Sequence, residues 1–248
     1  MGRSKIRVVR EDKNSKVIVI TPLLPGHKIS KETKKTIQRN DIPFTWIHSI
    51  GENNIPMNVS NGLNFYLKLM KGKAKYILPL DRDIILGRHM LDKMYKVIDK
   101  SGDRIAYTYT NFKFQGTVNV EFDARPFEIE ALMTNNFISS NSMMKISALN
   151  EVGGFVTDER YKRLLDWALF LKFLDNEYFG EPCTNASFVA ISTENDISAG
   201  TNTDFHLKKG RVFNDFIKPL LARYVKDESE ILTTNPGEPE VMSFSEEL

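Results

Sequence analysis

The feature that most constrains this chain is the alternation of short apolar runs with amphipathic segments in its first half. β-branched and aromatic runs at residues 16–20, 44–50 and 76–80 predict buried strands. Residues 30–39 and 58–71, which lie between these runs, predict helices. Strands that alternate with helices favour a parallel sheet with helical connections.

The second half continues this pattern less regularly. We expect these further elements: a helix at 88–99, a strand at 104–110, a polar and aromatic hairpin within 111–130, a strand at 137–146, a helical turn at 149–155, a helix at 161–174, a strand at 188–192, and a helix over 205–225 interrupted around Gly210 and Pro219. The predicted fold class is α/β, with a mostly parallel mixed sheet flanked by helices in a single domain. We divide the chain into a loose basic lead-in (1–15), one folded domain (16–225) and an acidic tail (226–248).

The charge of the chain is unevenly distributed. Residues 227–248 hold seven acidic and no basic side chains, so residues 1–226 carry +9 within a net charge of +2. A basic body suits an anionic ligand, such as a nucleotide, a nucleic acid or an anionic membrane surface. The alternative is a solvated basic surface with no ligand.

The cysteine count and the hydropathy exclude several classes of protein. Cys183 is the single cysteine, so neither an intramolecular disulfide nor a cysteine-based zinc site can form, and a reducing compartment is expected. The apolar run at residues 17–20 is too short to span a membrane, and no signal peptide is expected. We therefore predict a cytoplasmic protein without an integral membrane segment, with peripheral membrane association left open.

An Asp-x-Asp motif follows the third predicted strand. Asp81 and Asp83 flank Arg82, and two carboxylates at this spacing can bind one hard cation such as Mg²⁺ or Mn²⁺. Arg82 could pair with a phosphate or offset the two negative charges. A solvated turn is the alternative interpretation of the motif.

A single acid, Asp166, lies in a largely apolar helical segment. A carboxylate in such a setting has to be paired or placed at a cavity, and the helix N-terminus favours its ionised form. It would suit a general base that removes a proton from a hydroxyl. A helix cap, or a partner for Lys162 or Arg163, is the alternative.

Polar side chains also follow the first two predicted strands. Thr21 and Ser49 stand where these strands end, as Asp81 does after the third. Ligands bind beyond the carboxyl ends of such strands, so we expect all three side chains to face one crevice. Gly153 and Gly154 alone indicate only a turn.

The order of these pieces resembles the family-2 glycosyltransferases, inverting enzymes of the GT-A fold, from about Lys16 to Ser198. The similar segments are the opening strand Val17-Ile18-Val19-Ile20-Thr21-Pro22, Asn61-Gly62-Leu63 at a helix start, the Tyr76-to-Asp83 strand with its Asp-x-Asp, Val152-Gly153-Gly154-Phe155, and Leu165-Asp166-Trp167-Ala168-Leu169-Phe170-Leu171. This resemblance implies a nucleotide-sugar half (16–110), an acceptor half (111–204) and a C-terminal helix (205–225).

The resemblance also implies roles for individual residues. Asp83 would coordinate a divalent metal, Mn²⁺ or Mg²⁺, and Asp81 would contact the ribose or the metal. Asp166 would be the catalytic base that deprotonates the acceptor hydroxyl. The donor, a nucleotide-diphosphate sugar, would also contact Thr21, Pro22, Ser49, Glu52, Asn61 and Arg82. Asn141, Ser142 and Trp167 would line the acceptor side, where the acceptor is a glycan, a lipid-linked or another hydroxyl compound, DNA included.

The chain departs from the family pattern at three places. His48 and Ser49 stand where the family has an Asp that holds the uracil ring, with Glu52 further on. Leu165 replaces the Glu that precedes the catalytic Asp. The region of a late metal-binding His offers Glu194 or Asp196 instead.

The sequence leaves two other functions open. A non-catalytic module with this fold would bind a nucleotide, a glycan or a partner without turnover. A nucleotidyltransferase would need a glycine-rich phosphate loop after the first strand, and residues 22–26 are a poor version of one.

Overall fold

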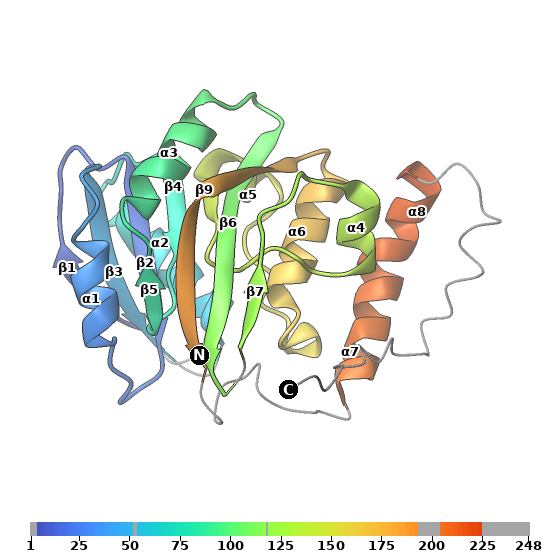
Figure 1. The fold of residues 1–248 in the computed structure, drawn as a ribbon, viewed down its shortest axis with the longest axis horizontal. Coiled ribbons are helices and arrows are strands. Elements are labelled where there is room, and N and C mark those ends of the chain that lie inside the picture. Colours follow the sequence, from blue (N-terminus) through green and yellow to red (C-terminus); the bar gives the residue numbers. More distant parts are fainter. Residues whose placement is uncertain (1–3, 52–53, 118, 193–203, 225–248) are drawn as a thin grey trace, which may run out of the picture.

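The structure is a computed structural model that describes residues 4–51, 54–117, 119–192 and 204–224. Its centre is one mixed sheet in the order β1-β3-β2-β4-β8-β6-β9-β5, with β7 paired to β6 (Figure 1). The strands are β1 (Lys5–Arg10), β2 (Val17–Leu23), β3 (Phe44–Ile50), β4 (Tyr76–Pro79), β5 (Ile84–Leu86), β6 (Ile105–Gly116), β7 (Val120–Phe122), β8 (Met143–Lys145) and β9 (Phe179–Ser192).

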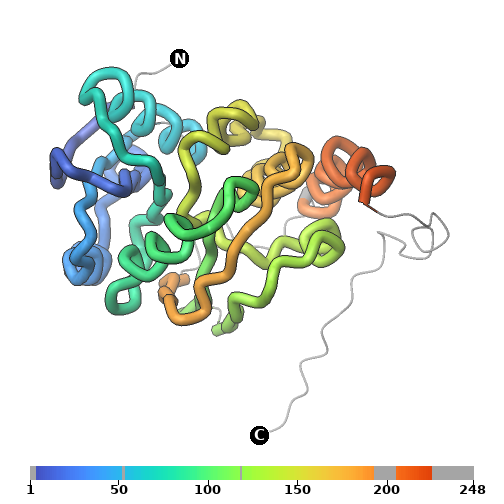
Figure 2. Tube along the Cα trace, turned by 90° about the horizontal axis from the view of Figure 1, so that it is seen from above, coloured from blue at the N-terminus to red at the C-terminus, as the bar shows by residue number. Residues whose placement is uncertain are grey.

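Helices cover both faces of this sheet. They are α1 (Lys31–Ile37), α2 (Ile55–Lys68), α3 (Met90–Lys100), α4 (Ile129–Thr134), α5 (Ile146–Glu151), α6 (Leu165–Asp175), α7 (Asp204–Val212) and α8 (Lys218–Tyr224), with a 3₁₀ turn at Glu159–Tyr161 and a π-helical turn at Phe213–Ile217. Figure 2 shows α1 and α3 on one side of the sheet, and α2, α5 and α6 on the other. The α/β fold class predicted from the alternation is confirmed.

The apolar side chains form two layers because successive residues of a strand point to opposite faces. In β2, Ile18 and Ile20 pack in the layer that contains helices α2 and α6. Val17 and Val19 of the same strand pack with α1 and α3. All four side chains are fully buried, so β2 is a central strand with no polar face.

The strands that position the site run parallel. β2 pairs in parallel with β3 on one side and with β4 on the other. β8 is antiparallel to both β4 and β6, so β6, and β9 parallel to it, run in the same direction as β4. Their carboxyl ends therefore lie together, at the lower edge of the sheet in Figure 1.

The N-terminal segment differs from the expected loose lead-in. Lys5–Arg10 forms edge strand β1, antiparallel to β3. The Arg10 guanidinium lies 4.0 Å from the ring centroid of Phe44. Strand β1 pairs with the backbone N–H and C=O groups along one side of β3. The charged side chains of β1, which is now the edge strand, disfavour pairing with another chain.

Other boundaries also differ from the sequence expectation. The strand expected at 137–146 is confined to Met143–Lys145, whereas the strand expected at 188–192 begins already at Phe179. The C-terminal helix departs from regular α-helix at Phe213–Ile217, rather than at Gly210 or Pro219. No helix in the described part of the chain has the length and apolar character needed to cross a membrane.

Candidate functional site

The turn between β4 and β5 carries Asp81, Arg82 and Asp83, and it is held from two directions. The backbone N–H of Asp81 donates to Asn141 Oδ1 at 2.9 Å, and Asn141 Nδ2 donates to Asp81 Oδ2 at 3.0 Å. On the other side, the Arg82 carbonyl accepts from the Ser30 N–H at 2.9 Å and from Thr33 Oγ1 at 3.0 Å. Both partners lie at the start of α1, so the turn is fixed between α1 and the loop before β8.

Asp166 lies in the first turn of α6 and is partly buried. Its Oδ1 accepts from the Trp167 N–H at 2.9 Å, and its Oδ2 accepts from Asn136 Nδ2 at 3.1 Å. Burial raises the pKa of Asp166 to about 6, against the lowering effect of these hydrogen bonds. A carboxyl group with this pKa is ionised at neutral pH and still basic enough to accept a proton.

Asp81 and Asp166 are brought into one site, although they are distant in the sequence. The negative charge of Asp81 contributes to the raised pKa of Asp166, which places the two carboxylates within electrostatic reach. Burial also raises the pKa of Asp81. Neither group forms a salt bridge with Lys or Arg among the residues that the structure describes.

Such a site favours a cation from outside the chain. Carboxylate oxygens are the preferred ligands of Mg²⁺ and Mn²⁺, and a divalent ion would offset the buried negative charge. The donor set of Asp81 with nearby Asp83 therefore fits the expected metal.

One loop, residues 135–142 between α4 and β8, contributes to both acids. Asn136 donates to Asp166, and Asn141 donates to Asp81. Asn136 was not predicted as a site residue, because nothing in the sequence around it indicates which distant acid it contacts. Asn141 was expected at the acceptor side, and the structure places it as the partner of Asp81.

The residues expected around the nucleotide lie on both faces of the sheet. Thr21 Oγ1 accepts from Trp46 Nε1 at 3.0 Å, and the His48 ring packs edge-on against Trp46. Ser49 lies on the opposite face, against Gly62 of α2. A Cβ atom added to Gly62 would lie 3.4 Å from the Cβ of Ser49. Thr21 and Ser49 therefore do not face one crevice, because the parallel register pairs Thr21 with His48 and Pro22 with Ser49.

His48 is a second residue to which the pattern assigned no role. It is buried, and its Nε2 has no hydrogen-bond partner. Burial lowers the pKa of His48 to about 4, with further lowering from Arg7 and Lys34. The imidazole is therefore neutral at physiological pH, at the carboxyl end of β3.

Three other expected site residues have structural partners. Trp167 is buried in the core and donates its indole N–H to the Leu132 carbonyl at 2.7 Å, so it offers no ring face to a sugar. Ser142 is buried, and its Oγ donates to the Ser139 carbonyl at 2.7 Å. Asn61 Nδ2 donates to Ser4 Oγ at 2.8 Å.

The paired glycines connect α5 with α6. Gly153 and Gly154 have φ values of 80° and 81°, which L side chains rarely adopt. The Gly154 carbonyl accepts from Lys172 Nζ of α6 at 3.3 Å. Glu52 and Glu194, expected at the nucleotide and the metal, lie outside the described residues, as does Asp196.

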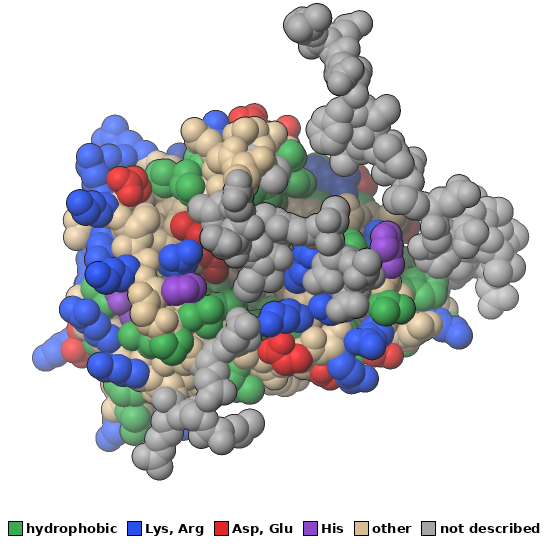
Figure 3. Space-filling model, turned by 90° about the horizontal axis from the view of Figure 1, so that it is seen from below, with side chains coloured by type: hydrophobic (Ala, Val, Ile, Leu, Met, Phe, Trp, Pro, Cys, Tyr) green, Lys and Arg blue, Asp and Glu red, His purple; other side chains and the backbone are tan. Residues whose placement is uncertain are grey.

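Figure 3 views the molecule from the carboxyl edge of the parallel strands. Lys and Arg side chains are numerous on this face, with acidic and histidine side chains among them. The arrangement agrees with the basic body found in the sequence, and it would attract an anionic ligand toward the edge that carries the acids.

Comparison with known proteins gives matches at the level of structure. No family model matches the chain, and no curated protein matches it in sequence. Solved structures do match: TarS 1-349 of S. aureus in complex with UDP-GlcNAc has a TM-score of 0.57 and 14% identity, over 89% of this chain and 76% of that chain. The mannosyltransferase PcManGT from Pyrobaculum calidifontis, in complex with GDP-Man and Mn²⁺, has a TM-score of 0.53 and 10% identity, over 84% of this chain and 65% of that chain.

These matches show the fold. A longer TarS structure matches with a TM-score of 0.54 and 12% identity, over 87% of this chain, and the match spans 45% of that TarS chain. The expected GT-A type of fold is thus confirmed by glycosyltransferase structures from a bacterium and from Pyrobaculum.

Proposed function

We propose that this chain is a metal-dependent, inverting glycosyltransferase that moves a sugar from a nucleotide-diphosphate sugar to an acceptor hydroxyl. The observation that carries the proposal is that one loop, residues 135–142, donates hydrogen bonds to both Asp81 and Asp166, in a fold shared with glycosyltransferases. Asp81 follows β4, in the nucleotide-sugar half of the domain. Asp166 lies in the first turn of α6, in the acceptor half.

Asp166 is the general base in this proposal. The acceptor hydroxyl oxygen attacks the anomeric carbon from the face opposite the diphosphate, and the bond from that carbon to the diphosphate oxygen breaks. Asp166 takes the hydroxyl proton, and its raised pKa of about 6 makes this transfer more favourable than for an ordinary Asp. The Asn136 amide and the Trp167 N–H orient the carboxylate for this step.

The donor side is formed by the turn after β4. Asp83 and Asp81 would hold Mn²⁺ or Mg²⁺, which supplies positive charge to stabilise the departing diphosphate. Arg82 and the basic surface would contact the phosphates. Thr21 and Pro22 at the end of β2 are the candidates for base contacts. Ser49 lies on the opposite face of the sheet, away from Thr21. The proposal extends to Asn61, Glu52 and Glu194.

UDP-GlcNAc and GDP-Man, which are bound in the two similar structures, are the donors to test. The acceptor is a glycan, a lipid-linked hydroxyl or DNA in our proposal. Asn141, Ser142 and Trp167 act on it indirectly, because they hold Asp81, the Ser139 carbonyl and the Leu132 carbonyl in place. We place the protein in the cytoplasm, in keeping with Cys183 as a single free cysteine, and propose that its basic surface can hold it at an anionic membrane.

The first experiment is a calorimetric titration with UDP, GDP, CDP and dTDP, each with and without Mn²⁺. Metal-dependent preference for one base is expected and names the donor class. Release of nucleoside diphosphate from the matching sugar donors then reports turnover. Asp166→Asn should remove turnover and leave nucleotide binding intact, whereas Asp175→Asn, at the exposed end of the same helix, should leave both intact. Full turnover in Asp166→Asn would contradict the assigned base.

A binding module without turnover is the second candidate, and His48 favours it. The buried neutral imidazole stands where the resembling family has an Asp for uracil. This candidate predicts nucleotide or glycan binding with no release of diphosphate at any metal concentration.

A further inference from the structure

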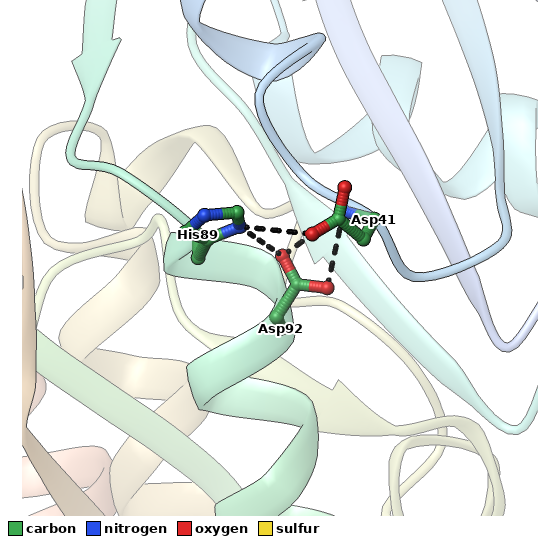
Figure 4. Close-up of side chains that lie close together, drawn as sticks. All are labelled: Asp41, His89 and Asp92. Carbon is green, nitrogen blue, oxygen red and sulfur yellow. Dashed lines mark hydrogen bonds and ion pairs between the residues drawn. The ribbon is translucent and has the colours of Figure 1, made fainter.

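A second group of possible metal ligands lies away from the candidate active site. Asp41 follows α1, His89 immediately precedes α3, and Asp92 lies in the first turn of α3 (Figure 4). His89 Nδ1 lies 3.3 Å from Asp41 Oδ2 and 3.5 Å from Asp92 Oδ2. The three potential ligand atoms all lie within 4.8 Å of one another.

The backbone fixes two of these ligands. Asp92 Oδ1 accepts from the Ile42 N–H at 2.7 Å and from the Asp41 N–H at 3.1 Å, so its carboxylate is oriented by the loop that carries Asp41. His89 has a φ of 55°, which turns its side chain toward both acids as the chain enters α3. Less reorganisation is needed to bind an ion when ligands are held in this way.

The distances fit a tetrahedral zinc ion. Zinc binds His nitrogen and carboxylate oxygen at about 2.0–2.2 Å, which separates neighbouring ligands in a tetrahedron by roughly 3.3–3.5 Å. Both contacts of His89 Nδ1 have this length. Two of the three separations therefore match a tetrahedron as they stand, and the third lies within 4.8 Å.

The fourth corner has space for another ligand. A cavity of about 470 Å³ is lined by Asp41 and His89 together with Arg39 and Arg88. An open position beside two guanidinium groups suits a water molecule or a small anion.

This cluster is separate from the Asp81 and Asp83 turn. Asp83 precedes β5, and His89 follows it, so the two groups lie at opposite ends of this strand. The three residues of β5 alone separate the two groups by about 10 Å.

We propose that Asp41, His89 and Asp92 form a zinc site that joins the loop after α1 to the start of α3. Arg88 opposes binding: its Nε lies 3.2 Å from His89 Nε2, as a donor to that nitrogen. Zinc on Nδ1 requires the imidazole proton to be on Nε2, so Arg88 has to move away. Its exposed side chain is free to do so, and its positive charge also disfavours the ion.

The test is calorimetric titration of the EDTA-treated full chain with Zn²⁺, together with visible absorption of the Co²⁺ form. We expect one equivalent of Zn²⁺ at this site, in addition to metal held by Asp81 and Asp83, and a tetrahedral Co²⁺ spectrum that reports the histidine site. His89→Asn, which suits a positive φ, and Asp41→Asn should each weaken binding at least tenfold. Arg88→Gln should tighten it. His27→Asn, at an exposed histidine, is the matched control and should bind Zn²⁺ as the parent chain does.

No binding by the parent chain, or equal binding by Asp41→Asn and the parent, would overturn the site. Unfolding of each variant in EDTA separates lost binding from lost structure. The Asp41 side chain is 86% exposed, so Asp41→Asn keeps the test decisive if His89→Asn does not fold.

Discussion

Replacing Asp166 with Asn should stabilise the folded protein, by an amount that depends on pH. The pKa of Asp166 is raised from 3.8 to about 6 by burial, so the ionised group prefers the unfolded state. A shift of about 2 units corresponds to about 3 kcal/mol at pH values well above 6. The cost disappears below about pH 4, where the group is protonated in both states.

The substitution also changes hydrogen bonds. Both carboxylate oxygens of Asp166 accept from donors, and the amide of an Asn can accept at only one of its two heavy atoms. The lost hydrogen bond costs about 1 kcal/mol. The net gain is therefore about 2 kcal/mol at pH 8, or about 4–8 °C in Tm for a domain of this size, and no gain is expected at pH 4.

The assay is urea and thermal unfolding of both proteins between pH 4 and pH 8. Asp175→Asn is the control, because Asp175 lies at the exposed end of α6 and pairs with Arg223 at 3.3 Å. It should change stability little at either pH. An Asp166→Asn protein that is no more stable than the parent at pH 8, or equally more stable at both pH values, would refute the assigned environment of the acid.

Four further predictions follow from the same geometry. The rate of sugar transfer, measured as diphosphate release, should rise with pH through about 6 as Asp166 ionises, and this rise should vanish in Asp166→Asn. Asn141→Ala should weaken metal-dependent nucleotide binding by about tenfold in calorimetry, because Asp81 loses both hydrogen bonds to this side chain. Gly62→Ala should cost about 1–3 kcal/mol in urea unfolding, since its Cβ would lie 2.9 Å from Ile20 Cγ2. EDTA should abolish transfer and Mn²⁺ should restore it, as the donor set of the Asp81 turn predicts.

Local signals in the sequence were sufficient where a segment's own residues determine its structure. The strand expected at residues 44–50 is β3 with the same bounds, because its β-branched and aromatic residues need burial on both faces. Helix α1 begins after Ser30, whose Oγ accepts from the Thr33 N–H at 2.9 Å. These features depend on neighbours within a few residues.

Local signals could not predict the register between strands or the contacts between residues distant in the sequence. Whether Thr21 and Ser49 point to the same face of the sheet depends on the register between β2 and β3. A shift by one residue would place them on the same face. Strand β9 starts at Phe179, earlier than expected, because its polar residues pair with β6 rather than follow an apolar pattern. Trp167 was expected to pack against a sugar ring. It lies in the core instead, because its indole N–H donates to the Leu132 carbonyl.

The position of β8 explains how the two acids come to share a site. Inserted antiparallel between β4 and β6, this short strand brings the preceding loop, residues 135–142, against the turn after β4. The same loop reaches α6 through Asn136, which donates to Asp166. A single segment therefore sets the positions of an acid from each half of the domain, and a change in its length should separate the two acids while leaving the parallel strands paired.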